Sequence, residues 1–276
     1  MGAVDQAFIQ AQEHRPAKSS STYAEGIPLI DLSSPDGLVS EIASPDPHDK
    51  ELLELHNVWP QYPPELKEAS EEYVKELEKL AFKLLELIAL SLGLPANRFH
   101  SFFRDQTTRV RLNHYPPCPA PDLALGVGRH KDGGALTILF QDDVGGLQVK
   151  RKSNGEWVTV KPTPDAYIVN VGDIIQVWSN EAYESVEHRV MVNSEKERYS
   201  IPYFFNPAHY TMVEPLEELT NEQSPPKYKT YSWGKFLMNR RLSNFKKLNV
   251  ENLQISHFRI SELADKLEGA LSINNN

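Results

Sequence analysis

The chain is poor in cysteine and lacks long apolar runs. Its 276 residues include one cysteine, Cys118, which excludes an internal disulfide framework and is typical of a reducing compartment. No run of apolar residues is long enough to cross a membrane as a helix. The first ten residues also lack the charged and apolar regions of a secretory signal. We therefore expect a cytoplasmic protein without a membrane partner.

Positive charge is also scarce. The 29 Lys and Arg residues face 38 Asp and Glu residues, for a net charge of −9, which argues against a nucleic-acid partner. The apolar fraction of 40% is ordinary and sufficient for a real core. The length suits one sizeable domain. We expect a monomer that acts on a small molecule.

The middle of the chain is typical of an all-β barrel or sandwich, because short β-rich runs alternate with turn signals. Asn154-Gly155, between two such runs, predicts a tight hairpin. The predicted strands are 110–112, 135–140, 147–150, 157–160, 167–171, 174–178, 188–192 and 200–205.

Helices are predicted on both sides of this β region. From about Pro64, apolar residues recur at three- and four-residue steps until Gly93 and Pro95 end the pattern. Segments 232–245 and 261–271 are further helix candidates. We divide the chain into a polar, partly disordered N-terminal region (1–63), a catalytic domain (64–260) and a C-terminal helix or tail (261–276).

His130-Lys131-Asp132 and His188 carry the chemistry. On an extended segment residues i and i+2 point the same way, so His130 and Asp132 can face one metal ion. His188 must then come from a different strand. Two imidazoles and one carboxylate suit Fe(II) and leave its other positions open for oxygen and substrate.

Several motifs carry a family resemblance. Residues 111–118 read Arg-Leu-Asn-His-Tyr-Pro-Pro-Cys, and residues 126–134 read Gly-Val-Gly-Arg-His-Lys-Asp-Gly-Gly. Val-Gly-Asp at 171–173, Ser-Val-Glu-His-Arg-Val at 185–190 and Arg-Tyr-Ser at 198–200 follow in order. Together they resemble the plant soluble 2-oxoglutarate- and Fe(II)-dependent dioxygenases, a family that includes flavonol synthase, anthocyanidin synthase and gibberellin oxidases. The resemblance covers roughly residues 50 to 260.

The resemblance implies a mainly β fold with helices, built on a double-stranded β-helix (jelly-roll) core with a helical layer. It implies an oxidoreductase that hydroxylates or desaturates a small plant metabolite such as a flavonoid, hormone or alkaloid. His130, Asp132 and His188 would be both the catalytic residues and the metal ligands. The cofactors would be Fe(II), 2-oxoglutarate and O2, with ascorbate as a supporting reductant.

The resemblance also implies a co-substrate site. Arg198 and Ser200 match the pair that holds the distal carboxylate of 2-oxoglutarate, and a guanidinium suits this task because its planar fork binds a carboxylate through two hydrogen bonds. Tyr115 would add a hydroxyl to the same carboxylate, and Asn113 would help to position the co-substrate. Phe204 matches a position where an aromatic ring stacks on the substrate.

The chain departs from the family after Ile42. Members continue there into a helix, a strand and further helix, whereas Ile42 is followed at once by Ala43-Ser44-Pro45-Asp46-Pro47. A long family segment is thus expected to be missing, leaving an unpaired sheet edge, marginal stability and weak or absent substrate turnover.

Two other functions stay open at this point. One is a catalytically impaired, truncated isoform that acts as a binding or decoy chain. The other, less favoured, is a zinc-dependent hydrolase with the same three ligands, which would have no need of Arg198 and Ser200. We expect His114, His209 and His257 to be structural or surface residues.

Overall fold

The computed structural model describes residues 57–245 and 252–260. It begins with helix α2 (Leu66–Ser91), close to the predicted start at Pro64. Leu77, Ala81, Leu85 and Ala89 follow each other at four-residue spacing and are buried on one face. At the other end Gly93 adopts φ +75°, and Leu94 N donates to Ala89 O at 2.9 Å, which closes the helix in a Schellman motif. The predicted helix and its stop are confirmed.

The larger sheet has five antiparallel strands, with β9 at its centre. The order is β1-β9-β4-β7, and β2 also pairs with β9. The described part of the chain gives β7 one strand partner, β4, so β7 forms an edge. The strands are β1 (Arg109–Val110), β2 (Asn113–Tyr115), β4 (Leu136–Gln141), β7 (Ile168–Val171) and β9 (Arg198–Phe205).

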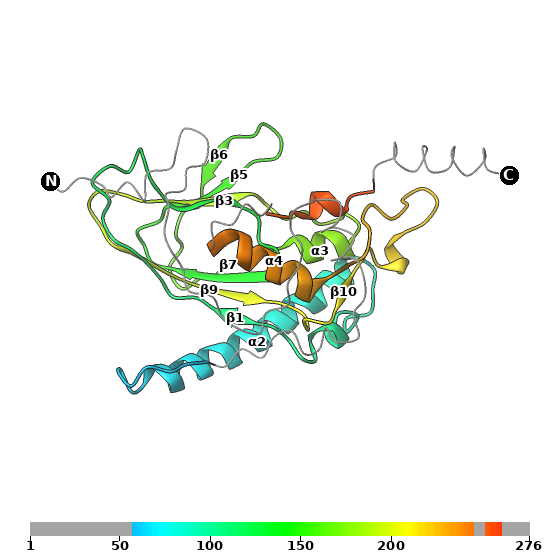
Figure 1. Cartoon of the computed structure of the whole chain (residues 1–276), viewed down its shortest axis with the longest axis horizontal. Coiled ribbons are helices and arrows are strands. Elements are labelled where there is room, and N and C mark those ends of the chain that lie inside the picture. Colours follow the sequence, from blue (N-terminus) through cyan, green and yellow to red (C-terminus); the bar gives the residue numbers. More distant parts are fainter. Residues whose placement is uncertain (1–56, 246–251, 261–276) are drawn as a thin grey trace.

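The smaller sheet has four antiparallel strands in the order β3-β8-β5-β6. They are β3 (Leu125–His130), β5 (Leu147–Lys150), β6 (Trp157–Thr159) and β8 (His188–Met191). Gly155, with φ +72°, lies in the turn between β5 and β6, so the hairpin predicted from Asn154-Gly155 is confirmed. The two sheets form separate layers in Figure 1. Tyr115 of the larger sheet and Leu147 and Val190 of the smaller one pack together between them.

Side chains along β4 and β9 point alternately into the hydrophobic core and into the space between the two sheets. Tyr203 and Phe205 of β9, with Leu136 and Ile138 of β4, join the main hydrophobic core together with α2, which packs against these two strands. Because successive side chains point to opposite faces, the residues between them face the space between the sheets. The helix-covered jelly-roll predicted from the sequence is confirmed, since both sheets are antiparallel and helices cover the outer face of one.

One predicted strand is wrong. Residues 174–178 form a helix, α3 (Asp173–Trp178), although Ile174, Ile175 and Val177 favour strands. All six residues of α3 are buried, so no alternation between two faces exists to stabilise a strand. Trp178 also stacks on Phe99 and Phe102, at 5.4 and 4.6 Å between ring centroids. Tertiary packing therefore overrides local propensity.

The prediction for 110–112 is partly wrong as well. Pairing with β9 is interrupted after Val110 and resumes at Asn113, so two short strands replace one. Strand β3, which carries His130, was not among the predicted strands. The remaining short elements are η3 (His100–Phe103), β10 (Met212–Val213), η4 (Glu217–Leu219) and β11 (Tyr231–Ser232).

Helix α4 (Trp233–Phe245) confirms the predicted helix at 232–245, and η5 (Ile255–Phe258) follows it. The predicted helix at 261–271, the N-terminal region 1–56 and the departure after Ile42 lie outside the described residues. No helix of the described part is long and apolar enough to cross a membrane.

Candidate metal and co-substrate site

Two histidines face each other across neighbouring strands of the smaller sheet. The register of β3 and β8 makes His130 and His188 direct partners, and their ring centroids lie 4.2 Å apart. The register of β3 shifts twice before His130. Such irregularities re-aim side chains and are common beside functional sites. The predicted pair of imidazoles is therefore brought together by the sheet itself.

Backbone carbonyls orient both imidazoles. His130 Nδ1 lies 2.8 Å from Gly128 O, and His188 Nδ1 lies 3.1 Å from Val186 O. An Nδ1–H that donates to a carbonyl leaves the lone pair on Nε2, which is the arrangement usual for metal-ligating histidines. Burial and the neighbouring His188 lower the pKa of His130, outweighing Asp132 and the Gly128 carbonyl, so the neutral form is favoured.

Asp132 completes the group. Its Oδ2 accepts hydrogen bonds from Thr137 Oγ1 at 2.7 Å and Asn170 Nδ2 at 2.9 Å. Its Oδ1 lies 3.6 Å from His130 Nε2 and 3.7 Å from His188 Nε2. Burial raises the pKa of Asp132, but the two imidazoles and the two hydrogen bonds outweigh it, so the net pKa is lowered. The carboxylate is thus ionised and fixed with one free oxygen toward both imidazoles.

The donor set fits a divalent metal ion. The three candidate ligand atoms all lie within 4.8 Å of one another. Two donors that bind one ion at about 2.1 Å lie at most about 4.2 Å apart, so both carboxylate–imidazole distances are compatible with a shared ion. Two nitrogens and one oxygen, with no thiolate, suit Fe(II) with open positions. Within residues 57–245 and 252–260 this is the single group of three such side chains.

The start of α3 holds the loop that carries Asp132. Asp173 N donates to Asp132 O at 2.8 Å, and Ile174 N donates to Gly134 O at 3.1 Å. A Cβ at Gly172 would lie 2.2 Å from Gly134 O, so only glycine permits this approach. Helix α3, which the sequence had predicted as a strand, therefore positions the loop of residues 131–134 that carries the candidate metal ligand Asp132.

A second set of polar residues lies on the neighbouring strands β2 and β9 of the larger sheet. In the β2–β9 pair Asn113 is opposite Ser200, and Tyr115 is opposite Arg198. The guanidinium of Arg198 lies 5.0 Å from the centroid of the Tyr115 ring. Arg198 Nη1 donates to Ser200 Oγ, and Asn113 Nδ2 also donates to Ser200 Oγ, both at 3.3 Å. The four residues predicted for the co-substrate thus meet on one face.

Arg198 is a buried cation whose described partners are all uncharged. Its side chain is buried, with 2% of the residue exposed, and its Nη2 donates to Gln141 Oε1 at 2.9 Å. Its Nε is buried and has no hydrogen-bond partner in the described part. Burial lowers the pKa of Arg198, which Tyr115 and Asp142 offset only in part. Asp142 offsets the burial of this charge only in part, and Arg198 forms no direct ion pair in the described part of the chain, so its guanidinium is suited to an anionic ligand.

The candidate metal ligands and the candidate co-substrate residues line one small cavity between the sheets. The cavity measures about 180 Å³ and its walls include His130, Asp132, His188 and Arg198. A second cavity of about 1110 Å³ also reaches His130 and Asp132. Phe204, the predicted substrate contact, lines both cavities.

The larger cavity carries a cationic wall. Arg109 and Arg111 approach it from the β1–β2 region, and Arg241 approaches it from α4. Burial and then the neighbouring Arg241 lower the pKa of Arg109, while Asp132 opposes the shift and Arg111 adds to it. The guanidinium of Arg109 lies 4.8 Å from the centroid of the Phe204 ring. In the described part of the chain none of the three arginines forms an ion pair with a carboxylate.

Several site residues were missed at the level of the sequence. Thr137 and Asn170 are polar residues inside otherwise apolar strands, and they are register partners in β4 and β7. That signal was available, because a polar side chain in a buried strand requires a partner. Arg109 and Arg241 are far apart in the chain and gave no such signal.

The three histidines predicted to be structural or surface residues, His114, His209 and His257, lie outside the candidate ligand group. His114 Nε2 lies 3.3 Å from Glu197 Oε2, and its ring stacks on Tyr199 at 4.7 Å. His257 belongs to the capping box of η5, and the backbone of His209 accepts from Gly234 N.

The chain is similar to known oxygenases. Residues 106–207 match the 2OG-Fe(II) oxygenase superfamily. Among curated proteins, Jasmonate-induced oxygenase 2 of Arabidopsis thaliana is 40% identical over 233 residues, which are 81% of this chain and 62% of the relative. Gibberellin 20 oxidase 1 of Arabidopsis thaliana is 42% identical over 167 residues, which are 60% of this chain and 44% of the relative. The chain spans about half the length of the curated relatives it matches.

Solved structures of oxygenases are similar to this chain as well. A crystal structure of JOX2 with 2OG, Fe and JA is 42% identical with a TM-score of 0.65, over 72% of this chain and 57% of that one. Dioxygenase for auxin oxidation 1 of Arabidopsis thaliana, in complex with 2-oxoglutarate, is 30% identical with a TM-score of 0.54. That match covers 71% of this chain and 67% of the auxin dioxygenase.

Proposed function

The chain belongs to the 2OG-Fe(II) oxygenase superfamily, and from this premise we propose that it oxidises a small plant metabolite with Fe(II), 2-oxoglutarate and O2. One observation carries the proposal. The three candidate metal ligands, His130, Asp132 and His188, line the same cavity as the buried cation Arg198. A metal site alone would fit many reactions. A metal site that shares a cavity with a buried guanidinium lacking a direct ion pair favours a small anionic co-substrate that binds both.

In this proposal the three ligands hold Fe(II), which supplies the activation of O2 when bound. The protein's own part is geometric. Thr137 and Asn170 fix the Asp132 carboxylate, and the carbonyls of Gly128 and Val186 fix the imidazoles. Preorganised ligands lose little freedom on binding a metal, and such supporting hydrogen bonds tune metal affinity.

Arg198 would bind the distal carboxylate of 2-oxoglutarate. Its unpaired Nε is the donor that a carboxylate would accept from, and Ser200 Oγ lies within hydrogen-bond distance of the same guanidinium. Tyr115 and Asn113 would complete the polar end of the small cavity. The apolar side chains of Leu139, Leu147 and Val190 line the same cavity and would keep water away from the reacting groups.

We further propose that the substrate carries a carboxylate. Arg109, Arg111 and Arg241 on the wall of the larger cavity repel one another, Asp132 offsets this only in part for Arg109, and a carboxylate on the substrate would offset it further. Arg109 lies over Phe204, so an acid held by Arg109 and Arg241 would bring its apolar body onto that ring. Relatives whose names or complexes point to jasmonate and auxin support this substrate class. Bound Fe(II) would supply the oxidation of a substrate C–H bond with which both hydroxylation and desaturation start.

The test is succinate formation from 2-oxoglutarate by the purified chain with Fe(II) and O2, first alone and then with plant carboxylic acids, including jasmonic acid and indole-3-acetic acid. We expect slow Fe(II)-dependent turnover alone and faster turnover with an acid substrate. Tight 2-oxoglutarate binding without turnover would indicate the impaired isoform instead. Hydrolysis that requires zinc and does not depend on 2-oxoglutarate would indicate the zinc-dependent hydrolase.

We also propose that the protein is a cytoplasmic monomer of plant secondary metabolism that uses no nucleic-acid or membrane partner. The net charge of −9 supports the absence of a nucleic-acid partner, and the single cysteine supports a reducing compartment. Sedimentation of the metal-loaded chain would test the monomer.

A further inference from the structure

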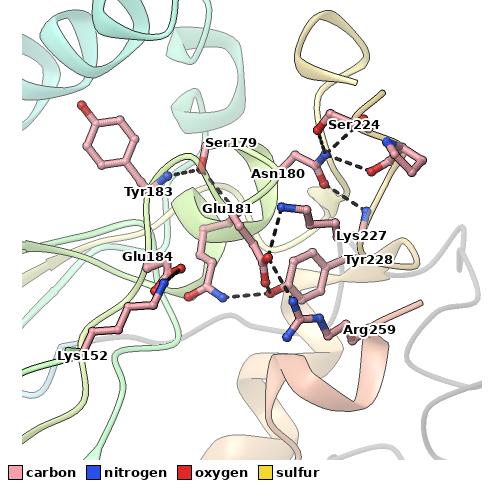
Figure 2. Close-up of polar contacts among 12 residues, drawn as sticks. Lys152, Ser179, Asn180, Glu181, Tyr183, Glu184, Ser224, Lys227, Tyr228 and Arg259 are labelled. Carbon is pink, nitrogen blue, oxygen red and sulfur yellow. Dashed lines mark hydrogen bonds and ion pairs between the residues drawn. The ribbon is translucent and has the colours of Figure 1, made fainter. Parts of the chain in front are cut away.

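The loop after α3 contains two consecutive residues in the left-handed region. Asn180 has φ +49° and Glu181 has φ +70°. Neither is glycine, so this conformation costs free energy and persists only where the surroundings fix it. Here both side chains turn toward the segment 224–228 (Figure 2).

Asn180 binds the backbone of that segment. Its Nδ2 donates to Pro225 O at 3.0 Å, and its Oδ1 accepts from Lys227 N at 3.0 Å. Asn180 is buried, so these hydrogen bonds are shielded from solvent. It therefore fixes the path of the chain into Tyr228.

Glu181 binds three donors at once. Its Oε1 accepts from Tyr228 Oη at 2.7 Å, and its Oε2 lies 3.2 Å from Lys227 Nζ and 3.1 Å from Arg259 Nη2. Burial raises the pKa of Glu181, but Tyr228 and the two cations outweigh it, so the net pKa is lowered. One carboxylate thus ties the end of α3 to two segments that are distant in sequence.

Those two segments form a wall of the larger cavity. Lys229 N donates to Phe258 O at 2.7 Å, and Ile260 N donates to Lys227 O at 2.9 Å, so segment 227–229 pairs with segment 258–260. Tyr228 and Arg259 themselves line the cavity, as do Gln254, Ile255 and Ser256. Glu181 does not line either cavity.

The other end of the wall is held by α4. Arg240 donates to Leu253 O at 3.4 Å and to Lys131 O at 3.1 Å, and Asn239 Oδ1 accepts from Leu253 N at 3.3 Å. The wall is therefore held near Lys131 by α4. At its far end Glu181 shares this role with Asn180, which binds Lys227 N, and with Gln176, whose Nε2 donates to Tyr228 Oη at 2.8 Å.

We propose that Glu181 is a positioning residue for the substrate. Its carboxylate fixes the wall formed by residues 253–260 and Tyr228, and it thereby sets the affinity for the acid substrate without contact to metal, 2-oxoglutarate or substrate. The substrate part rests on the proposed function, whereas the placement of the wall does not.

Hydrogen exchange of the Fe(II)-loaded chain under anaerobic conditions tests the placement. In Glu181→Gln the amides of Lys229 and Ile260 should exchange at least about tenfold faster, because hydrogen bonds to a charged group are lost. The control is Glu184→Gln, which removes an exposed ion pair to Lys152 in the same loop. It should leave both amides unchanged.

Kinetics test the effect on the substrate. With the best acid of the panel, Glu181→Gln should raise KM for the acid by at least about tenfold and leave KM for 2-oxoglutarate within about twofold. Glu181→Asp keeps the charge and should restore part of the affinity. Glu181→Gly suits φ +70°, so it should melt close to the wild type and still lose the acid affinity.

Unchanged exchange in Glu181→Gln, or equal acceleration in Glu184→Gln, would overturn the proposal. Faster exchange with an unchanged KM for the acid would overturn its substrate part. If the wild type oxidises no acid, the proposed substrate class fails, and the exchange result alone decides the role of Glu181.

Discussion

Replacement of Arg198 by leucine should separate 2-oxoglutarate binding from metal binding. Arg198 is 2% exposed and its described partners are uncharged, so a bound carboxylate would be its counter-ion. Loss of a buried, charge-assisted contact costs about 2–5 kcal/mol, which corresponds to a rise of roughly 30-fold to several thousandfold in the apparent Kd. The three candidate metal ligands keep all their supporting hydrogen bonds in this variant.

The stability of the metal-free protein gives an independent check. Removing a buried cation that has no direct ion pair relieves its desolvation, while two hydrogen bonds to neutral oxygens and the attraction of Asp142 are lost. We therefore expect the free energy of unfolding of Arg198→Leu to stay within about 1–2 kcal/mol of the wild type. A large destabilisation would mean that Arg198 is structural.

The assay is titration of 2-oxoglutarate into the Fe(II)-loaded, anaerobic protein, with iron content measured in parallel. Arg198→Lys should restore affinity only in part, because an ammonium cannot form the planar fork. Arg98→Leu, which breaks an ion pair with Glu218 away from both cavities, is the matched control. An apparent affinity of Arg198→Leu within about twofold of the wild type would refute this role for Arg198.

Three further outcomes are expected. Asp132→Ala removes the only protein anion of the candidate ligand set and should abolish tight Fe(II) binding; an unchanged affinity by equilibrium dialysis would end the assignment. Tyr115→Phe should raise the 2-oxoglutarate requirement by about tenfold or less, in the range of one hydrogen bond, and no change in KM would exclude its hydroxyl from the site. If a family segment is missing after Ile42, a version with such a segment inserted should melt higher and turn over more substrate; equal sharp melts with full oxidation by the present chain would make the segment dispensable.

Local signals in the sequence predicted much of the fold. The four-residue spacing of the apolar face of α2 and the glycine at its end are local features, as is Asn154-Gly155 in the β5–β6 hairpin. The failure at 174–178 has a physical cause. Ile174, Ile175 and Val177 favour a strand because propensity is local, whereas their complete burial is set by the tertiary structure.

The candidate site divides in the same way. His130, Asp132, His188, Arg198 and Ser200 were predictable because short motifs carry them in order. The cationic wall and the contacts of Glu181 were not, because each joins segments that meet only in the folded chain. The role of Glu181 could not be predicted from the sequence, because an acidic residue in a polar loop is ordinarily solvated. Its left-handed φ and its three partners are visible only in three dimensions.

The central claim is that one cavity holds both Fe(II) and 2-oxoglutarate. The most direct measurement is the visible charge-transfer absorption that a 2-keto acid produces when it chelates Fe(II), recorded during anaerobic titration of the purified chain. We expect a saturable band with one equivalent of Fe(II), absent in Asp132→Ala and shifted to much higher 2-oxoglutarate concentrations in Arg198→Leu. No band in the wild type, or the same titration in all three proteins, would contradict the claim.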